Sequence, residues 1–351
     1  MYESSTLCSF LHNVNKTLHE KVVQRGSRGV VGVSSRASAK IVWHVTECLQ
    51  LALLLEVSAY PKPGNVHRTA DFEKTSYEHF LASAVAVVPH LKHATEQGMM
   101  ISSGKISPKE VEIGRIIKNA VTSVNMWQSG GNTLLGSMIL LSPIAVAAGM
   151  TLARGGAFSL TKLRENMRVV VESSTSVDAV DVYDAILTAK PGGLGKAPKL
   201  DVNDPASRQR ILDEDVTLLD VFRIASVYDS VASEWVNNYP ITFDLGYPYF
   251  TQQLEKTRDI NTATVHTFLR ILSEVPDTLI ARKASLSRAR EVSAEAKRVL
   301  EMGGLMTTSG RRLLWSFDKK LRDPKHELNP GTTADITAAV LAISTLGGHR
   351  P

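Results

Sequence analysis

The chain of 351 residues contains only two cysteines, Cys8 and Cys48. Two thiols near one end form neither a zinc-binding spacing nor a disulfide framework, so we expect a reducing, cytoplasmic location. Aromatic residues make up only 6% of the chain, and no basic, aromatic-interleaved surface of the kind that binds single strands is evident. The net charge of +5 fits anionic small molecules as well as nucleic acid, and we expect no nucleic-acid partner.

Acidic residues are absent between positions 21 and 46, whereas five basic residues lie between 21 and 40. Glu3 and Glu20, together with the lack of an amphipathic stripe, argue against a transit peptide. We interpret residues 1–38 as a flexible basic N-terminal extension, or as the product of a start placed too early. Residues 39–351 are then the folded domain.

Charged residues are also missing between positions 119 and 153, and residues 134–153 are mostly apolar. A membrane-spanning helix needs about 20 predominantly apolar residues. This segment is interrupted by Gly136, Ser137, Ser142 and Pro143, and it follows a polar turn. We therefore predict the buried central helix of a bundle and expect no membrane partner.

Alternation of apolar and polar residues, which marks strands, is nearly absent, and the best candidate is the short run 241–245. The long segment from Lys190 to about Asp213 has no clear period and is interpreted as a linker or a functional loop. The sequence therefore predicts an all-α protein, a single multi-helix bundle with functional loops. Helical periodicity is found at about 39–58, 76–98, 108–127, 132–150, 160–172, 176–189, 215–237, 248–273, 285–302, 308–321 and 332–346.

The loop at 60–68 cannot be helical, because two prolines fix the backbone and Gly64 favours a turn. Lys62 and Arg68 make it cationic, which suits an anion or phosphate clamp. A plain interhelical turn with solvated charges is the alternative reading.

Two further loops lead into apolar helices. Residues 130–133 read Gly-Gly-Asn-Thr, and Asn132 or Thr133 would cap the helix that follows. Residues 329–333 read Asn-Pro-Gly-Thr-Thr, and Thr332 with Asp335 fits a capping box. Free amides at a buried helix start can also bind phosphate.

The segment at 191–196 is rich in glycine, which allows a ligand to approach the backbone closely. Asp201 and Asp204 follow it, and carboxylates beside a triphosphate could hold Mg²⁺. Asp229 is a lone carboxylate among apolar neighbours and would need a metal or a basic side chain. Asp277 would be a helix cap or a functional acid, with Arg282 and Lys283 available to bind phosphate.

Together these motifs resemble the triphosphoribosyl-dephospho-CoA synthase family, in its archaeal-type branch, over residues 39–347. The carrying motifs are Pro-Lys-Pro-Gly-Asn-Val at 61–66, Gly-Gly-Asn-Thr-Leu-Leu-Gly at 130–136, Pro-Gly-Gly-Leu-Gly at 191–195, Asp-Thr-Leu-Ile-Ala-Arg-Lys at 277–283 and Asn-Pro-Gly-Thr-Thr-Ala-Asp at 329–335. The resemblance implies an all-helical, ATP-dependent transferase. Its members move the triphosphoribosyl group of ATP to the 2′-hydroxyl of 3′-dephospho-CoA and release adenine. The product is a prosthetic-group precursor.

The sequence departs from the bacterial pattern at two places. Leu134 and Leu135 stand where bacterial members carry His-Lys, and the 191–196 loop differs from the bacterial Arg-Gly-Glu type. The resemblance therefore implies nucleotide binding more strongly than it implies the acceptor.

Such a transfer would pass through an oxocarbenium-like state. Asp277 or Asp335 would deprotonate the attacking hydroxyl, and Asn132 or Asn65 would stabilise the departing adenine. Asp201, Asp204 and Asp229 are the candidates for Mg²⁺. The candidates for binding phosphate and nucleotide are Lys62, Gly64, Asn65, Arg68, Thr133, Gly192, Gly193, Lys196, Arg282, Lys283, Asn329, Gly331, Thr332 and Thr333.

Two alternatives stay open at this point. The first is a Mg²⁺-dependent helical hydrolase that cleaves a ribosyl-nucleotide bond with water in place of the acceptor. The second is a catalytically silent nucleotide-binding protein, which would bind ATP without releasing adenine. The expected partners are ATP and a dephospho-CoA-like acceptor, and a homo-oligomer is a further expectation.

Overall fold

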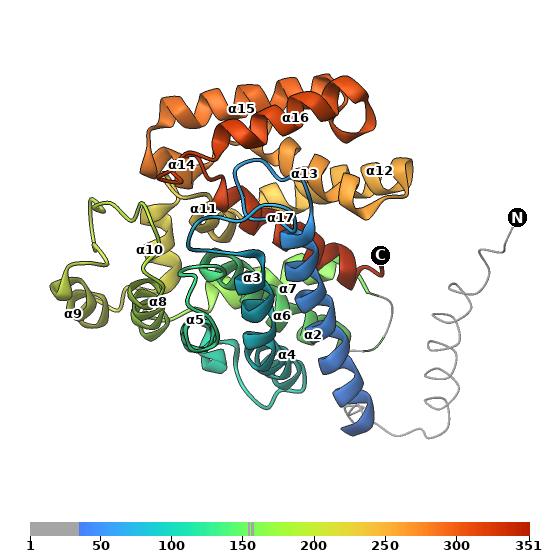
Figure 1. Ribbon diagram of the computed structural model, residues 1–351. Helices are drawn as coiled ribbons and strands as arrows, with labels where there is room; N and C mark the ends of the chain where they lie inside the picture. The colour runs from blue at the N-terminus through green and yellow to red at the C-terminus, as the bar shows by residue number, and fades with distance from the viewer. Residues whose placement is uncertain (1–34, 154, 156–157) are drawn as a thin grey trace, which may run out of the picture.

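The computed structural model describes residues 35–153, 155 and 158–351. Residues 1–34, most of the predicted extension, lie outside the described residues, and the first described helix begins at Ser35. The all-α prediction is confirmed, because the described chain contains helices and only one isolated bridge, between His67 and Ala70 (Figure 1).

The elements keep their labels from Figure 1. Two short 3₁₀ helices are η1 (Pro108–Val111) and η3 (Gly304–Met306), and η2 (Ile241–Gly246) is a π-helix. The α-helices are α2 (Ser35–Ser58), α3 (Tyr77–Ala86), α4 (Val88–Ser102), α5 (Ile113–Trp127), α6 (Leu135–Ala153), α7 (Leu160–Glu172), α8 (Ser176–Ala189), α9 (Pro205–Asp213), α10 (Leu218–Ala225), α11 (Ser230–Val236), α12 (Tyr247–Thr257), α13 (Ile260–Glu274), α14 (Thr278–Lys283), α15 (Leu286–Glu301), α16 (Thr308–Leu321) and α17 (Gly331–Leu346).

Four predicted helices are each divided in two, and the 108–127 segment becomes η1 and α5. The 76–98 segment breaks at Val87 between α3 and α4, 215–237 becomes α10 and α11, and 248–273 becomes α12 and α13. Two short helices, α9 and α14, were not predicted from periodicity. Each begins at an aspartate cap, Asp204 for α9 and Asp277 for α14, so the local capping chemistry explains both.

The strand candidate at 241–245 is wrong, because these residues form the π-helix η2. The buried carboxylate of Glu234 accepts hydrogen bonds from the amides of Ile241 at 2.8 Å and Thr242 at 2.9 Å. It also accepts one from the Thr242 hydroxyl. This carboxylate binds the first amides of the segment and favours a helical turn over a strand.

The charge-free helix α6 lies at the centre of the bundle, where 83% of its most apolar window is buried. Pro143 inside it cannot donate to the carbonyl of Ile139. The indole of Trp235 donates to that carbonyl instead, at 3.0 Å, and the hydroxyl of Tyr239 donates to the carbonyl of Leu140 at 3.1 Å. The buried indole of Trp235 therefore replaces the hydrogen bond that Pro143 cannot make. Besides α6, α2 is long and apolar enough to span a membrane, and half of its window is buried.

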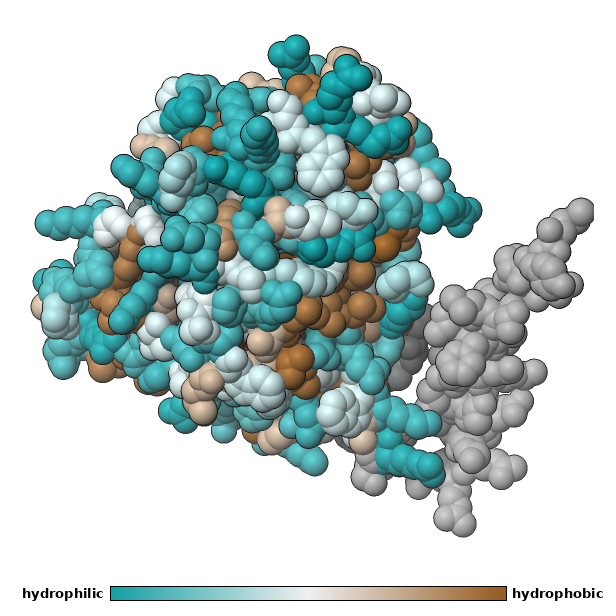
Figure 2. All heavy atoms as spheres, in the orientation of Figure 1, coloured by the Kyte–Doolittle hydropathy of each residue, from teal (hydrophilic) through white to brown (hydrophobic). Residues whose placement is uncertain are grey.

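The core consists of two clusters. The larger includes residues of α2 to α13 and α17. The smaller is made by α13 to α16, with Ala59 and Leu328 from the adjoining loops. Figure 1 shows α15 and α16 as an upper layer, with α17 beneath them and the loop that follows α2 between. The surface in the same view is predominantly hydrophilic, including the part over α15 and α16 (Figure 2).

Candidate active site

The five motif loops contact one another in a continuous chain, although they are far apart in sequence. The first contact joins the loop at 59–70, named here the proline loop, to the turn before α17. The side-chain amide of Asn65 donates to the carbonyl of Pro330 at 3.4 Å. A β-carbon on Gly64 would lie 3.1 Å from Pro330 Cδ and 3.1 Å from the carbonyl of Leu328. The positive φ of Gly64, +70°, therefore serves both the turn and this close approach.

The second contact joins α14 to α17 through the buried carboxylate of Asp277. One oxygen caps α14 by accepting from the amides of Leu279 at 2.9 Å and Ile280 at 3.1 Å. The other accepts from the amide of Thr333 at 2.7 Å and from its hydroxyl at 2.8 Å. The predicted cap of α14 is confirmed. The predicted capping box at the start of α17 is wrong, because Asp277 binds the Thr333 amide.

The third contact joins α6 to α17. Ser137 Oγ donates to Asp335 Oδ1 at 2.6 Å. Asp335, predicted to complete the capping box, thus points to α6 instead, where the backbone of Gly136 leaves room for its carboxylate.

The fourth contact joins the glycine-rich segment 190–196, named here the glycine loop, to α14. A β-carbon at Gly192 would lie 2.8 Å from Lys283 Cε, and one at Gly193 would lie 2.8 Å from Lys283 Cγ. The ammonium of Lys283 donates to the carbonyl of His326 at 3.0 Å. These four contacts connect all five loops. The structure therefore brings together the motifs that were predicted separately from the sequence.

At the centre of this chain lies a cluster of buried charges. Lys62 donates to the Glu56 carboxylate and to the Glu56 carbonyl, the latter at 2.9 Å. Burial lowers the pKa of Lys62, and the charges of Glu56 and Asp335 oppose that change. Lys62 is therefore already engaged by a carboxylate at the base of the site, which makes it a weaker phosphate ligand than predicted.

Asp335, the second carboxylate predicted as a base, also belongs to this cluster. Burial raises its pKa to about 7, against the hydrogen bond from Ser137, and the charges of Glu56 and Asp277 add to the rise. A carboxylate with a pKa near the working pH combines a useful base population with driving force for proton transfer. Asp277 also has a raised pKa through burial, but its two oxygens accept four hydrogen bonds. Of the two predicted bases, Asp335 is the better placed.

Sequence reasoning missed two members of this cluster, Glu56 and Ser137. Glu56 was detectable, because it is the only charged residue between positions 48 and 61, in an otherwise apolar helix end. The reasoning that singled out Asp229 applies equally to it. Ser137 gave no signal, because a serine in an apolar helix is ordinary.

The three metal candidates do not form a protein-made metal centre. Asp201 accepts from the amides of Ala197 and Asn203, each at 2.7 Å, and Asp204 caps α9 through Ala206 at 2.9 Å. Asp229 caps α11 and accepts from Arg282 at 2.5 Å, so the basic partner predicted as an alternative is present. Throughout the described ranges, no group of three or more His, Cys, Asp or Glu could hold a metal ion.

Asp201 and Asp229 both influence the phenol of Tyr228. The charges of both raise the pKa of the Tyr228 phenol, after the larger effect of burial, while Arg282 opposes them. The Asp229–Arg282 ion pair and Asp201 therefore both affect the surroundings of Tyr228.

The remaining nucleotide-binding candidates vary in how accessible they are. Exposed Lys196 lies on the glycine loop, whereas exposed Arg68 packs its guanidinium 4.0 Å from the ring centre of Tyr60. Thr332 accepts from the hydroxyl of Thr278 at 3.2 Å, and the amide of Gly331 donates to the carbonyl of Asn329 at 2.9 Å. Thr133 shares a hydrogen bond of 2.7 Å with Ser83.

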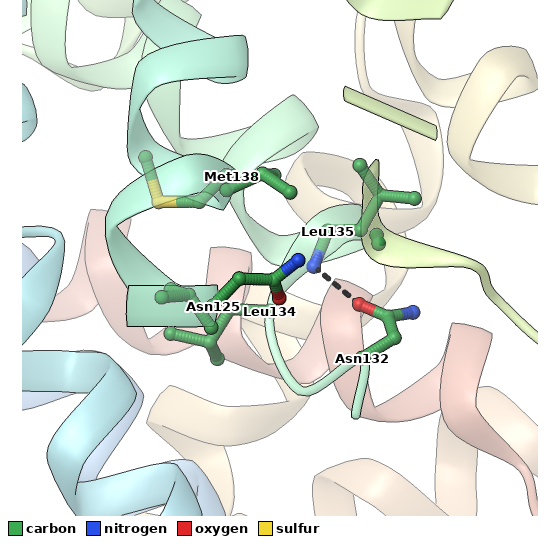
Figure 3. A pocket seen from close by; sticks show the side chains of 8 residues that line it. Asn125, Asn132, Leu134, Leu135 and Met138 are labelled. Carbon is green, nitrogen blue, oxygen red and sulfur yellow. Dashed lines mark hydrogen bonds between the residues drawn. The ribbon is translucent and has the colours of Figure 1, made fainter. Parts of the chain in front are cut away.

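Asn132 caps α6, as predicted, by accepting from the amide of Leu135 at 3.1 Å. Leu134 and Leu135 are buried. Figure 3 shows them with Asn125, Asn132 and Met138 around a small hollow beside the α6 start. The bacterial His-Lys pair is thus replaced by apolar packing.

Comparison with known proteins supports the resemblance. The sequence model of the family described as ATP:dephospho-CoA triphosphoribosyl transferase matches residues 42–351. The 2-(5''-triphosphoribosyl)-3'-dephosphocoenzyme-A synthase of Klebsiella pneumoniae is 24% identical over 310 residues, which covers 86% of this chain and 90% of that protein. A protein of Malonomonas rubra, named a probable synthase of the same kind, is 21% identical over 322 residues, covering 88% and 90%.

A crystal structure from Archaeoglobus fulgidus, assigned by name to the triphosphoribosyl-dephospho-CoA synthases, has a similar fold. Its TM-score is 0.55 at 20% identity, and the match covers 77% of this chain and 100% of that one. The fold, the connected motifs and the family match over most of the chain agree. This chain belongs to the ATP:dephospho-CoA triphosphoribosyl transferase family.

Proposed function

We propose that this protein transfers the triphosphoribosyl group of ATP to the 2′-hydroxyl of 3′-dephospho-CoA and releases adenine. The observation that carries the proposal is Asp335, a carboxylate with a pKa of about 7 placed where the motif loops meet. The family match defines the reaction class, and Asp335 supplies the proton acceptor that this class requires.

In the proposed reaction, the acceptor oxygen forms a bond to C1′ of the ATP ribose while the bond from C1′ to the adenine nitrogen breaks. The electron pair of the broken bond leaves with adenine, which takes up a proton from solvent. Asp335 accepts the proton of the attacking hydroxyl. Ser137, which donates to Asp335 Oδ1, would hold the carboxylate in position for this transfer.

The triphosphate is proposed to lie against the glycine loop and α14, where Lys196, Arg282 and Lys283 provide positive charge. Arg282 pairs with Asp229, so binding of phosphate at Arg282 would compete with that ion pair. Mg²⁺ is proposed to arrive with the triphosphate, because it commonly uses one or two carboxylates plus substrate phosphates. Asp229 and Asp201 are the carboxylates that fit this arrangement, and Mg²⁺ would neutralise phosphate charge there.

The test is to incubate the purified protein with ATP and Mg²⁺, with and without 3′-dephospho-CoA, and to measure free adenine by chromatography. Adenine release that requires the acceptor, with a product mass equal to acceptor plus triphosphoribosyl group, is the expected result. Release of adenine and free ribose triphosphate without acceptor would instead establish the hydrolase. ATP binding without adenine release from any mixture would establish the silent nucleotide-binding protein.

From its sequence we also propose a cytoplasmic location, a homo-oligomeric state and no nucleic-acid or membrane partner for this protein. The adenine assay uses the isolated chain and depends on none of them.

A further inference from the structure

The end of α16 lies against the proline loop and contacts it through one buried carboxylate. Asp318 Oδ1 accepts from the backbone amide of Gly64 at 3.0 Å. Arg322, at the end of the same helix, donates its Nε to both Asp318 oxygens at 3.1 Å. A β-carbon on Gly64 would lie only 2.8 Å from Leu321 Cβ, so the loop backbone is pressed directly onto this helix end.

Arg322 extends the contact along the loop. Its Nη2 donates to the carbonyl of Asn65 at 2.6 Å, and its Nη1 donates to the carbonyl of Asp71 at 3.4 Å. Its guanidinium lies 5.8 Å from the ring centre of Phe72. One arginine therefore contacts the middle of the proline loop and the two residues that follow it while it pairs with Asp318.

His67 completes the arrangement from the loop side. Its Nδ1 lies 3.1 Å from Thr69 Oγ1, and its Nε2 lies 3.6 Å from Asp318 Oδ2. The ring is fully buried and meets Trp315 of α16 edge-on at 6.5 Å. Within the described part of the chain, His67 Nε2 has no hydrogen-bond partner, so Asp318 is the nearest group able to stabilise it.

We propose that Asp318 and Arg322 are positioning residues, which hold the proline loop so that Lys62 and Asn65 are placed correctly against Asp335 and the α17 turn. In this role both act through the loop and not through contact with substrate. The proposal rests on the proposed function for its kinetic consequence, whereas its structural part concerns the loop alone.

Three observations support a positioning role for the pair. The proline loop contains no helix or strand, so side-chain contacts set its conformation. Its residues Lys62 and Asn65 lie in the site. The charges of Asp335 and Arg322 affect the pKa of Lys62, and Asn65 donates to the carbonyl of Pro330. The helix that supplies Asp318 belongs to the smaller core cluster. The pair therefore fixes the proline loop, and with it the site, relative to the helices of that cluster. Displacements of about 1 Å in such supporting contacts can cost roughly 100-fold in rate.

The main experiment compares Asp318→Asn with wild type. Asparagine keeps the shape of the side chain but places a donor amide against Arg322 or His67. The contact between α16 and the proline loop then loses its negative charge. Arg322→Lys keeps the charge and removes the forked geometry, and it serves if Asp318→Asn folds poorly. Glu295→Gln is the matched control, because it breaks the Lys320–Glu295 ion pair between α15 and α16 without touching the loop.

Two measurements are made on each variant. Hydrogen exchange by mass spectrometry reports on peptides covering 59–72, and α13 peptides serve as an internal reference. Adenine release gives kcat and the KM for ATP. We expect Asp318→Asn and Arg322→Lys to speed exchange in the 59–72 peptides and to lower kcat about 10- to 100-fold. The KM should stay within about twofold, and Glu295→Gln should behave as wild type.

Unchanged exchange at 59–72 in both variants would overturn the proposal, whatever the kinetics. Faster exchange with wild-type kcat would also overturn it, because the loop position would then not matter to the reaction. If wild-type protein releases no adenine with 3′-dephospho-CoA, the proposed function fails, and the exchange measurement alone decides whether the pair holds the loop.

Discussion

Gly136 lies directly against the carboxylate of Asp335, so close that a β-carbon on Gly136 would be 2.1 Å from Asp335 Oδ2. The next residue, Ser137, donates to the other oxygen at 2.6 Å. Two successive positions at the start of α6 therefore define where the proposed base can lie. Glycine is required at 136 for space, since its φ is not positive.

Gly136→Ala should abolish adenine release while the protein still folds. The alanine methyl displaces the end of the Asp335 side chain, which can rotate away without moving the backbone. We expect a loss of at least about 100-fold in kcat, the lower range for a misplaced general base, with little change in the melting temperature. Gly347→Ala is the control, because its β-carbon would meet nothing closer than 3.3 Å. Wild-type turnover in Gly136→Ala would contradict the assignment of Asp335.

The rate should depend on pH through Asp335. The base must be ionised to accept a proton, so kcat should rise with pH through about 7, the pKa of Asp335. In Glu56→Gln, a negative charge that raises this pKa is removed and the charge of Lys62 is no longer neutralised. Both changes favour the ionised form of Asp335, so the acidic limb of the pH–rate profile should move to lower pH. A limb that stays in place would show that another group titrates.

Asp335 should also affect stability, with the opposite sign from an ordinary surface carboxylate. Its pKa rises from 3.8 to about 7 on folding, so between these values the folded state holds a proton that the unfolded state has lost. The free energy of unfolding therefore falls as pH rises from about 4 to about 7. Asp335→Asn has no carboxyl to titrate and does not show this loss. The free energy of unfolding of the variant, relative to that of wild type, should therefore be higher at pH 8 than at pH 4. Urea denaturation at the two pH values tests this, and a pH-independent difference between the two proteins would disagree with it.

Asp277 should matter more for stability than for the chemical step. Its oxygens accept from two amides of α14 and from both donors of Thr333. In Asp277→Asn one oxygen becomes a donor, which leaves a buried donor of Thr333 unpaired, and we expect about 1–3 kcal/mol of destabilisation. Thr333→Val removes only the hydroxyl and should cost less. If Asp277→Asn has wild-type stability and no activity, Asp277 rather than Asp335 acts on the substrate.

Restoring the bacterial pair should harm this protein. Leu134 and Leu135 are buried beside Val121, Val124 and Met138 (Figure 3). His and Lys at these positions would place polar or charged groups among apolar side chains, and an unpaired buried charge costs about 3 kcal/mol or more. The double variant should therefore unfold at a lower temperature than wild type. Equal stability together with a lower KM for ATP would mean that the hollow can accept a cation and a phosphate.

Much of the fold could be predicted from local sequence patterns. Helical periodicity identified most helices, and the caps at Asn132 and Asp277 were identified from local chemistry, because the cap and the amides it binds are two or three residues apart. The five motifs were likewise visible as short runs whose turn residues and charges are adjacent in the chain. Helix breaks inside periodic segments, such as the one at Val87, were missed because periodicity continues across them.

The partners within the site depended on the tertiary structure. Ser137 and Asp335 are 198 residues apart, Gly64 and Asp318 are 254 apart, and nothing local in the sequence pairs them. Lys62 was predicted as a phosphate ligand, but packing of the proline loop places it against Glu56. The pKa of Asp335 near 7 likewise arises from burial among charges contributed by α2 and the start of α14. Local chemistry therefore determined the helices and the motifs, whereas long-range packing decided which motif residues are free to act.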